Sequence, residues 1–484
     1  MSVPSEGPPG RRPPSTGGVS VLYGGPEGVS AAGNQLWLPS SPGLDWGHDD
    51  VTDSWFGLET AAGDFDGDGF ADLAIGTFDW EQVNVLYGSD AGLTTQRDQR
   101  WTSTTPGLVP GVPAYGSQYT QFGGVLETGD FDGDGFADLA LGIADEPDLS
   151  EAVGHVRILY GSAAGLAIER NQDWSEGTPG VLGVPDGCCD GFGSTLVAGD
   201  FGRGPQDDLA IAEPGDRGGF VHVLFGGVGV GLTADHDQIW SQDSAGVPGH
   251  RTDGDRFGSA LAAGDLGGRA GLDDLAIGAP GADGGAGAVV VLYARGHGFE
   301  AADSQEWTQD SPFVEDEAEP GDGFGTSLAT GNFNVHSHED LAIGVPGENS
   351  ATLTDSGGVE VLYNAWTTCS PSGFDTLCAD EDQLWTLDAP GLPGRAATDG
   401  LFGHALSSRQ APPWSRHGPI PADDLVVGVP GHSVRRFLQA GAAAVIYGTD
   451  LGGLTSTGSQ LWSLDSPGVL GDPGRLERFG NSVG

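Results

Sequence analysis

The stretch Asp64-Phe65-Asp66-Gly67-Asp68-Gly69-Phe70-Ala71-Asp72 decides how this sequence is interpreted. It returns as Asp130-Phe131-Asp132-Gly133-Asp134-Gly135-Phe136-Ala137-Asp138, and both copies run directly into a short apolar segment. Four carboxylates within nine residues repel one another unless a cation lies between them. Because hard oxygen ligands in a loop interrupted by glycine suit Ca²⁺, the two stretches predict two calcium loops.

An EF-hand begins with the same acidic pattern, but it requires Glu at position 12 and a helix on each side. Position 12 is Ile75 in one copy and Leu141 in the other, inside expected strands. A β-turn-β calcium loop fits instead, with side chains at positions 1, 3, 5 and 9 and a backbone carbonyl at position 7 as ligands. The alternative is a metal-free acidic turn in water. The predicted ligands are Asp64, Asp66, Asp68, Asp72 and the Phe70 carbonyl for one ion, and Asp130, Asp132, Asp134, Asp138 and the Phe136 carbonyl for the other.

Outward from these loops the sequence repeats itself, with three landmarks that each occur seven times. Short apolar segments end in an aromatic residue at Tyr23, Tyr87, Tyr160, Phe225, Tyr293, Tyr363 and Tyr447. The pattern Gln-x-Trp ends at Trp37, Trp101, Trp174, Trp240, Trp307, Trp385 and Trp462. Phe-Gly begins at Phe56, Phe122, Phe192, Phe257, Phe324, Phe402 and Phe479. A fourth landmark, Asp-Leu-Ala-Ile-Gly or a variant, occurs only six times and begins at Asp72, Asp138, Asp208, Asp274, Asp340 and Asp424.

The apolar segments between the landmarks are too short for helices and rich in Val, Ile and Tyr, which predicts β-strands. Asp-Leu-Ala-Ile-Gly is continuously apolar rather than alternating, as expected for a strand covered on both faces. Four such strands per repeat, each sheet covered by its neighbours, predict the blades of a β-propeller.

These landmarks resemble the FG-GAP repeats of the integrin alpha-chain β-propeller and its bacterial relatives. The resemblance rests on Phe-Gly, the acidic loop and Asp-Leu-Ala-Ile-Gly-(Ala/Val)-Pro at 274–280 and 340–346, and it covers residues 17–484. It implies an all-β, seven-bladed propeller with blades that begin near residues 56, 122, 192, 257, 324 and 402. The seventh blade is expected to be shared by the two termini, from 479–484 and 17–55, and to lack one strand; the alternative is a chain truncated at one end. Residues 1–16 are expected to form a disordered tail rich in Pro and Gly.

The remaining acidic loops are degenerate and therefore weaker metal candidates. Residues 200–208 keep both ends but lose the two middle carboxylates, 265–274 is one residue longer, and 332–340 exchanges carboxylates for amides and histidines. A metal-free turn is the favoured interpretation of each, and His336 with His338 gives only a weak transition-metal pattern. The residues concerned are Asp200, Asp208, Asp265, Asp274, Asn332, Asn334 and Asp340.

The amino-acid composition argues against some classes of binding partner. The net charge is −50 at pH 7 and Lys is absent, which argues against a nucleic-acid partner or an anionic lipid surface. No apolar run reaches the ~20 residues of a membrane helix. The first 16 residues have no apolar core, so they lack the pattern of a secretory signal peptide. Cys369 and Cys378 bracket a short loop and are the expected disulfide, whereas the adjacent Cys188 and Cys189 do not easily bond to each other.

No catalytic constellation stands out, so we expect a monomeric, non-catalytic, calcium-stabilised binding or adhesion-like module, extracellular or at the cell surface. Its ligand would be a protein or a glycan. The alternative is the propeller portion of a larger secreted or surface enzyme. Ligands of integrin-like propellers lie on the face away from the calcium loops, where variable loop residues are the expected contacts. The residues expected on that face are Trp80, Tyr115, Tyr119 and Phe313.

Overall fold

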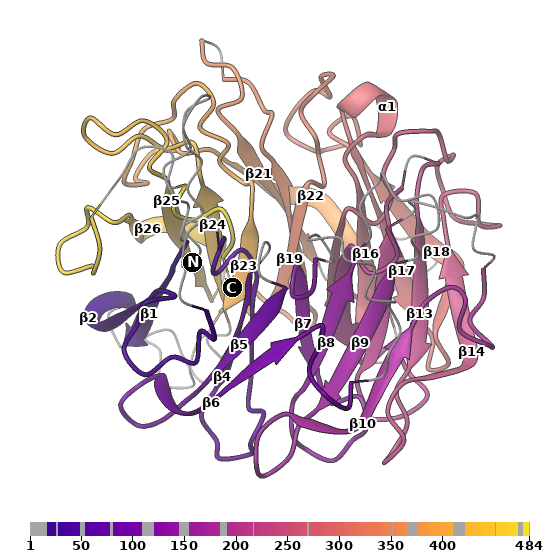
Figure 1. Cartoon of the computed structure of the whole chain (residues 1–484). Helices are drawn as coiled ribbons and strands as arrows, with labels where there is room; N and C mark the ends of the chain where they lie inside the picture. Colours follow the sequence, from indigo (N-terminus) through magenta and orange to yellow (C-terminus); the bar gives the residue numbers. More distant parts are fainter. Residues whose placement is uncertain are drawn as a thin grey trace.

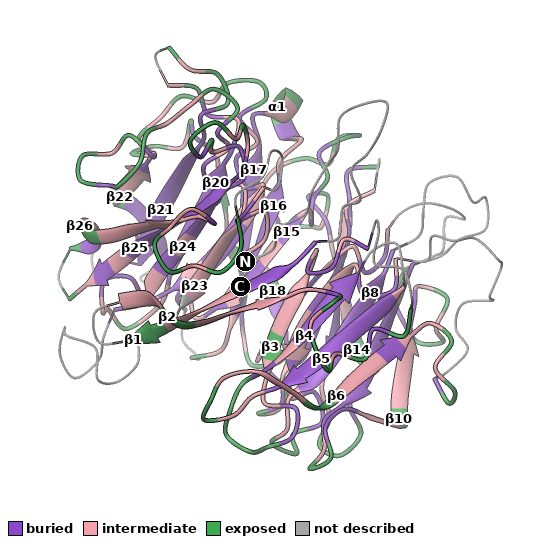
Figure 2. Ribbon diagram, turned by 60° about the vertical axis from the view of Figure 1, so that its left-hand side comes forward, coloured by how far each residue is buried: buried purple, intermediate pink, exposed green. Residues whose placement is uncertain are grey.

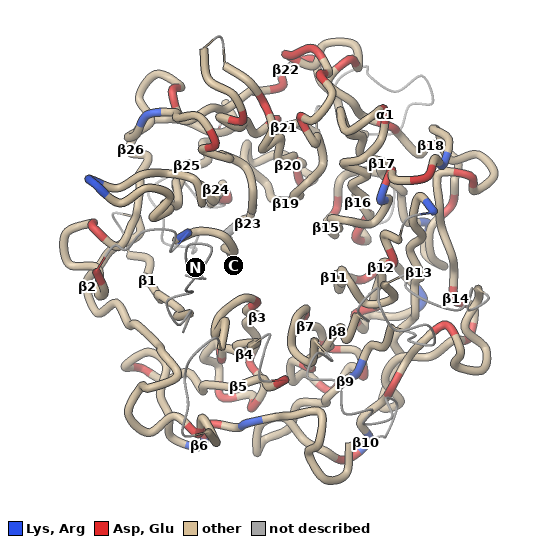
Figure 3. Tube along the Cα trace, turned by 45° about the horizontal axis from the view of Figure 1, so that its top comes forward, with Lys and Arg blue, Asp and Glu red and all other residues tan. Residues whose placement is uncertain are grey.

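The structure is a computed structural model of the chain. It describes residues 17–25, 28–48, 54–77, 81–108, 121–144, 154–183, 191–215, 217–268, 271–350, 352–364, 376–409, 422–450, 452–472 and 478–483. Within these residues, six four-stranded antiparallel sheets and one two-stranded sheet lie around a common axis (Figures 1 and 3). The fold is therefore an all-β propeller, as the repeats predict.

Each four-stranded blade follows chain order from its first strand to its fourth. Blades one to three comprise β3 (Thr60–Gly63), β4 (Asp72–Thr77), β5 (Gln82–Tyr87), β6 (Thr94–Thr102), β7 (Val125–Gly129), β8 (Asp138–Ile143), β9 (His155–Tyr160), β10 (Ala167–Trp174), β11 (Thr195–Gly199), β12 (Asp208–Glu213), β13 (Phe220–Phe225) and β14 (Thr233–Trp240). Blades four to six comprise β15 (Ala260–Gly264), β16 (Asp274–Ala279), β17 (Ala288–Ala294), β18 (Phe299–Trp307), β19 (Ser327–Gly331), β20 (Asp340–Val345), β21 (Gly358–Asn364), β22 (Leu377–Trp385), β23 (Leu406–Arg409), β24 (Asp424–Val429), β25 (Ala442–Thr449) and β26 (Gly453–Trp462). The short helix α1 (Ala282–Gly285) lies between the second and third strands of blade four. No helix in the described part of the chain has the length and hydropathy needed to cross a lipid bilayer.

The blades are arranged radially, with the first strands nearest the central axis (Figure 3). Second and third strands are buried almost throughout, because each sheet is covered on both faces by its neighbours (Figure 2). This explains why Asp-Leu-Ala-Ile-Gly is continuously apolar. The Phe of every Phe-Gly pair is buried between blades, as is the second residue of four acidic loops, Phe65, Phe131, Phe201 and Phe333.

A side-chain clasp joins neighbouring blades and accounts for two of the landmarks. The hydroxyl of Tyr87 donates to Gln99 Oε1 at 2.6 Å, and the Leu166 amide of the next blade donates to that hydroxyl at 3.3 Å. Gln99 Nε2 in turn donates to the Leu166 carbonyl at 2.9 Å. The same Tyr–Gln hydrogen bond recurs in the other blades that carry Tyr, and in the two-stranded sheet between Tyr23 and Gln35. The aromatic and Gln-x-Trp landmarks therefore join blades.

The expected seven blades, with a three-stranded closing blade, are not what the structure shows. It has six four-stranded blades and, at the closing position, a two-stranded sheet of β1 (Val19–Gly25) and β2 (Gly28–Trp37), here called the closing sheet. These strands hold the third and fourth positions of a blade, because Gly17 bridges Phe56 just as Gly441 bridges Phe479. Residues 479–483 form no strand, and among the residues that the structure describes no second strand pairs with them.

A cleft of about 440 Å³ lies beside β1, where the described part of the chain supplies no inner strands to the closing sheet. Its walls include Leu22 of β1, Leu73 of blade one and Val426 of blade six. All three are only partly buried, whereas the equivalent Leu86 and Leu139 in complete blades are fully buried. Figure 2 shows the same contrast, with β1 and β2 mostly intermediate or exposed.

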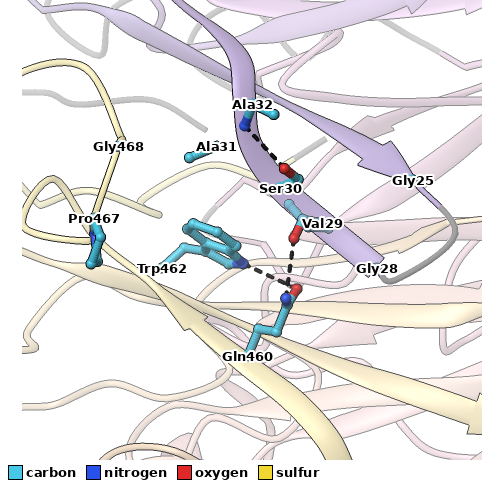
Figure 4. A pocket seen from close by; sticks show the side chains of 10 residues that line it. All are labelled: Gly25, Gly28, Val29, Ser30, Ala31, Ala32, Gln460, Trp462, Pro467 and Gly468. Atoms are coloured by element: carbon cyan, nitrogen blue, oxygen red, sulfur yellow. Dashed lines mark hydrogen bonds between the residues drawn. The ribbon is translucent and has the colours of Figure 1, made fainter.

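The closing sheet meets blade six at a junction between β2 and β26, here called the seam. Gln460 Nε2 donates to the Val29 carbonyl at 3.1 Å, and the Val29 amide donates to the Tyr447 hydroxyl at 3.3 Å. A second cleft of about 710 Å³ lies at the seam, where the Trp462 ring faces small residues of β2 (Figure 4). Trp462 Nε1 donates to Gln460 Oε1 at 3.3 Å, so its polar edge is satisfied within the protein.

Candidate metal centres

The first acidic loop connects the innermost strand β3 to β4 at the base of blade one. Carboxylate oxygens of Asp64, Asp66 and Asp72 converge, all within 4.8 Å of one another. Asp68 does not join this group; its Oδ1 accepts a hydrogen bond from the Phe70 amide at 2.9 Å. The positive φ angles of Gly67 and Gly69, 71° and 89°, allow the chain to curl around the carboxylates.

The second loop repeats this geometry between β7 and β8. Asp130, Asp132 and Asp138 converge within the same 4.8 Å, while Asp134 instead accepts from the Phe136 amide at 3.1 Å. The structure thus brings together three of the four predicted carboxylates in each loop. The Phe70 side chain is 42% exposed, in contrast to the buried Phe65 earlier in the loop.

The last aspartate of each loop also has a structural role independent of any metal. Asp138 Oδ2 accepts from the Phe131 amide at 2.9 Å, and its Oδ1 accepts from the Gly161 amide at 2.8 Å, at the end of the third strand. Asp72 makes the same two bonds in blade one. This clamp explains why the aspartate persists in blades whose loops have lost their other carboxylates.

Burial and mutual repulsion change the ionisation of these aspartates. Burial raises the pKa of Asp138 to about 8; two backbone amides oppose this, while the charges of Asp132 and Asp130 add to it. Burial, with a smaller contribution from Asp66 and Asp64, raises the pKa of Asp72 to about 6. In the absence of a cation, both loops therefore resist full ionisation.

An arginine that the sequence analysis did not identify reaches each intact loop from the fourth strand of the same blade. The Arg97 guanidinium pairs with Asp66, and that of Arg170 pairs with Asp132 Oδ2 at 2.5 Å. Each also lies over the tyrosine ring of its blade, Arg97 at 5.0 Å from the Tyr87 centroid. The sequence does contain a pattern that identifies this arginine. Arg occurs two residues before the Gln of Gln-x-Trp only in the two blades with intact loops.

The degenerate loops are held by protein groups. Asp208 keeps both clamp bonds, to Phe201 and Gly226, and Asp200 Oδ1 accepts from the Gly202 amide. The pKa of Asp208 is raised to about 8, mainly by burial.

In the longer loop, His338 Nδ1 lies 2.8 Å from Asp265 Oδ1, and Asp274 keeps only one clamp bond, to Ala294. Burial raises the pKa of Asp274 well above its usual value. His336 is engaged separately, with its Nδ1 3.1 Å from the Asn364 carbonyl, so the two histidines do not converge.

The loop at 332–340 has become an amide turn. Asn332 Nδ2 donates to the His336 carbonyl at 2.6 Å, Asn334 Oδ1 accepts from the His336 amide at 3.1 Å, and Asp340 keeps both clamp bonds. None of the residues in these three loops belongs to a cluster of three metal-ligating side chains in the described part of the chain.

The residues of the two intact loops fit a Ca²⁺ ion. Asp132 is almost fully buried, yet its Oδ1 has no hydrogen-bond partner, as expected of an oxygen oriented for a cation. Each cluster offers only oxygen donors, which is the preference of a hard cation. A bound ion would be held by Asp64, Asp66 and Asp72 in one loop and by Asp130, Asp132 and Asp138 in the other.

The predicted ligand face is described only in part. Phe313 lies in the loop that follows β18, is 73% exposed and adopts a φ of 74°. Trp80, Tyr115 and Tyr119 lie outside the described residues, as do Cys188 and Cys189. Cys378 takes part in a disulfide, and its predicted partner, Cys369, also lies outside the described residues.

Comparison with known proteins agrees with this architecture. The family described as FG-GAP repeat matches residues 56–79, which hold the Phe-Gly pair, the first acidic loop and β4. Phosphatidylinositol-glycan-specific phospholipase D of Bos taurus is 30% identical over 185 residues, or 35% of this chain and 20% of that protein. The Rattus norvegicus protein of the same name is 30% identical over 172 residues, or 34% of this chain and 19% of that protein. The matched region thus spans about a fifth of either relative.

Among solved structures, rhamnogalacturonan lyase YesW aligns over 96% of this chain and 68% of that chain, with 12% identity and a TM-score of 0.39. The assignment rests instead on the matched repeat and on its recurrence from blade to blade. In each of the six blades a Phe-Gly pair precedes the first strand and Asp-Leu-Ala-Ile-Gly, or a variant, forms the second. The FG-GAP repeat match covers residues 56–79, and the same landmarks recur in each of the six described four-stranded blades of this β-propeller.

Proposed function

We propose that this chain is a calcium-stabilised propeller that acts as a non-catalytic binding module of an extracellular or cell-surface protein. The observation that carries the calcium part is the convergence of three carboxylates in each intact loop, with Asp132 Oδ1 buried and without a partner. Burying that much negative charge is unfavourable without a compensating cation, and one arginine per loop compensates for only one carboxylate.

The ions would strengthen the joints between blades. The Asp64 carbonyl accepts a hydrogen bond at 3.0 Å from the Ala137 amide of blade two, and the Asp130 carbonyl accepts one at 3.1 Å from Asp207 of blade three. An ion that fixes the loop therefore also fixes the carbonyl that the next blade uses. Because Ca²⁺ would bind only the folded loop, it stabilises the folded state by mass action.

A rigid ring of blades would hold in place the loops on the face away from the acidic loops, where a ligand could bind them. Phe313 supports a role for that face, because a large apolar side chain held 73% exposed gains nothing from the core of its own protein. A protein or a glycan with an apolar surface is the ligand that such a residue would contact.

The calcium proposal is tested by thermal unfolding with Ca²⁺ and with a chelator. We expect Ca²⁺ to raise the melting temperature, and we expect the Asp66→Ala, Asp132→Ala double variant to lose most of that increase. The matched control is Asn334→Ala, in a loop without a carboxylate cluster, which should keep the full increase. Equal melting temperatures with Ca²⁺ and chelator would refute the proposal.

The binding proposal is tested on protein and glycan arrays probed with the full chain in Ca²⁺. We expect a ligand whose signal falls in Phe313→Ser and is unchanged in Val228→Ser, which alters another exposed apolar residue, 70% exposed, on the face of the acidic loops. Signals that both substitutions reduce equally would indicate nonspecific adhesion of apolar surface and contradict the assignment of that face.

A second function is favoured by the comparison with the two phospholipases, in which the similar region is a small part of a much longer enzyme. On this proposal the chain is the propeller portion of a larger secreted or surface enzyme. The mass of the native polypeptide distinguishes the two functions. A native protein of about the 49.4 kDa of this sequence would contradict the larger enzyme.

A further inference from the structure

Two carboxylates and an imidazole meet at the boundary between blades two and three, at the end of the strands away from the acidic loops. Glu213 is the last residue of β12, His222 is the third residue of β13, and Glu176 follows the end of β10. One ligand atom from each lies within 4.8 Å of the other two. His222 Nε2 is 3.3 Å from Glu213 Oε1 and 3.8 Å from Glu176 Oε1.

The cluster is buried and its hydrogen bonding is incomplete. The side chains of His222, Glu213 and Glu176 are 0%, 3% and 8% exposed. Glu213 Oε2 and His222 Nδ1 are both buried without a hydrogen-bond partner. Two carboxylates therefore face one imidazole at a buried position, where charge is costly to hold.

His222 Nε2 and Glu213 Oε1 are within hydrogen-bond distance, and the spacing of the three ligand atoms also fits a metal ion. Zinc bonds to histidine nitrogen and carboxylate oxygen at about 2.0–2.2 Å, so the ligand atoms of a tetrahedral site are about 3.4 Å apart. The two distances from His222 Nε2 bracket this value. The Phe192 ring packs edge-to-face on the imidazole, with centroids 5.2 Å apart, and so fixes the direction of Nε2.

The chain also leaves room beside the cluster. Gly183 has a φ of 118°, and a Cβ atom there would lie 2.8 Å from Glu176 Oε1 and 3.2 Å from His222 Cε1. Gly183 is itself exposed, so an ion would have a short path from solvent.

The fold does not require polar residues at these positions. In blade six the three equivalent residues, Leu387, Val429 and Ala444, are all apolar, and in blade four they are Ala279, Val290 and the polar Gln242. All six are buried. The same space can therefore be filled by apolar packing, which is often as stable as a buried ion pair.

We propose that Glu176, Glu213 and His222 bind a divalent transition-metal ion of the zinc class, with one further position left for solvent or for a ligand atom. Mixed nitrogen and oxygen donors suit Zn²⁺ and its spectroscopic substitute Co²⁺. The site differs from the acidic loops in its donors and lies at the opposite end of the strands. It would place a Lewis-acidic ion on the face that we propose for ligand binding.

The test is a Co²⁺ titration of the full chain, with the acidic loops saturated with Ca²⁺, followed by visible absorption. We expect one Co²⁺ per chain, with the intense d–d bands of a tetrahedral site that Zn²⁺ abolishes. The Glu213→Ala, His222→Val double variant carries the residues of blade four and should lose these bands. The matched control, His338→Gln, removes the partly buried His338–Asp265 pair and should keep them.

Three outcomes would overturn the proposal: absence of the bands from the unaltered chain, their persistence in the double variant, or sulfur-to-metal charge transfer in the near ultraviolet. If the double variant does not fold, X-ray absorption of the Zn²⁺ form of the unaltered chain decides the question. One imidazole with oxygen neighbours supports the site, and oxygen neighbours alone contradict it.

Discussion

Calcium binding should release protons, and the two intact loops should release different numbers. Burial and the neighbouring charges raise the pKa of Asp138 to about 8, whereas the pKa of Asp72 rises only to about 6. A carboxylate must be ionised to bind the metal, so any proton that it carries is displaced when the ion enters.

The number of protons follows from the two pKa values. At pH 7 a group with a pKa of about 8 is about nine-tenths protonated, and one with a pKa of about 6 is about one-tenth protonated. Filling both loops at pH 7 should therefore release about one proton per chain, nearly all of it from the loop of Asp138. The release should approach two protons at pH 5 and fall to about a tenth of a proton at pH 9. The same competition should weaken Ca²⁺ binding at the Asp138 loop about tenfold for each pH unit below 8.

Isothermal titration calorimetry measures this release, because the observed enthalpy changes with the ionisation enthalpy of the buffer. Titrations in two buffers of different ionisation enthalpy at pH 5, 7 and 9 give the proton count at each pH. Asp132→Ala should remove the contribution of the second loop and leave only the small release of the first at pH 7. Saturable calcium binding with no proton release at pH 5 and pH 7 would refute the reasoning, since the aspartates would then already be ionised.

Three further predictions concern stability. In the presence of a chelator, the unaltered chain should melt at a lower temperature at pH 8 than at pH 5, because the folded-state pKa of Asp208, about 8, lies above its unfolded value. The stability gained from the proton bound to Asp208, on the order of 5 kcal/mol at most, is lost as the pH rises from about 4 to 8. Asp208→Asn should therefore flatten the dependence of the melting temperature on pH. In a denaturant titration, Phe131→Ala should lower the free energy of unfolding by about 3–5 kcal/mol, because it leaves a cavity between blades. Phe313→Ala, at an exposed position, should change the same quantity by less than about 0.5 kcal/mol. Equal effects would contradict the packing of Phe131 between blades. Tyr447→Phe removes the two hydrogen bonds of the Tyr447 hydroxyl at the seam, keeps the Gln460–Val29 bond, and should cost about 0.5–1.5 kcal/mol; an unchanged melting temperature would show that the seam does not depend on this hydroxyl.

The sequence predicted the propeller because its landmarks lie at repeated structural positions. Each Phe-Gly marks a blade boundary, and each Tyr–Gln pair marks the clasp to the next blade. The closing blade was predicted wrongly because Phe479-Gly480 has the sequence of a blade start. A first strand also needs a second strand to pair with, and Phe479 finds only the start of the third strand of blade six, at Gly441.

The sites were less predictable, because their geometry depends on residues from different strands. Asp68 and Asp134 fit the spacing of a calcium loop, but the turn directs each toward a backbone amide instead. The arginine that approaches Asp132 belongs to the fourth strand of the blade and becomes a neighbour only after folding. The Glu176, Glu213 and His222 cluster joins three strand ends of two blades, and no local motif relates them.

The seam has a consequence for the order in which the ring assembles. The clasp between blades one and two joins Tyr87 to Leu166, 79 residues apart, whereas the equivalent contact at the seam joins Val29 to Tyr447, 418 residues apart. Closing the longer loop costs about 1.5 kcal/mol more chain entropy, for the same kind of hydrogen bonds. The blades can therefore add to one another in chain order, beginning with the closing sheet, which Tyr23 and Gln35 join to Leu93 of blade one, while the seam with blade six can close only when all six are in place. Ring closure becomes the last step of folding, and its reversal gives the chain a linear, partly opened form in which every blade is still folded.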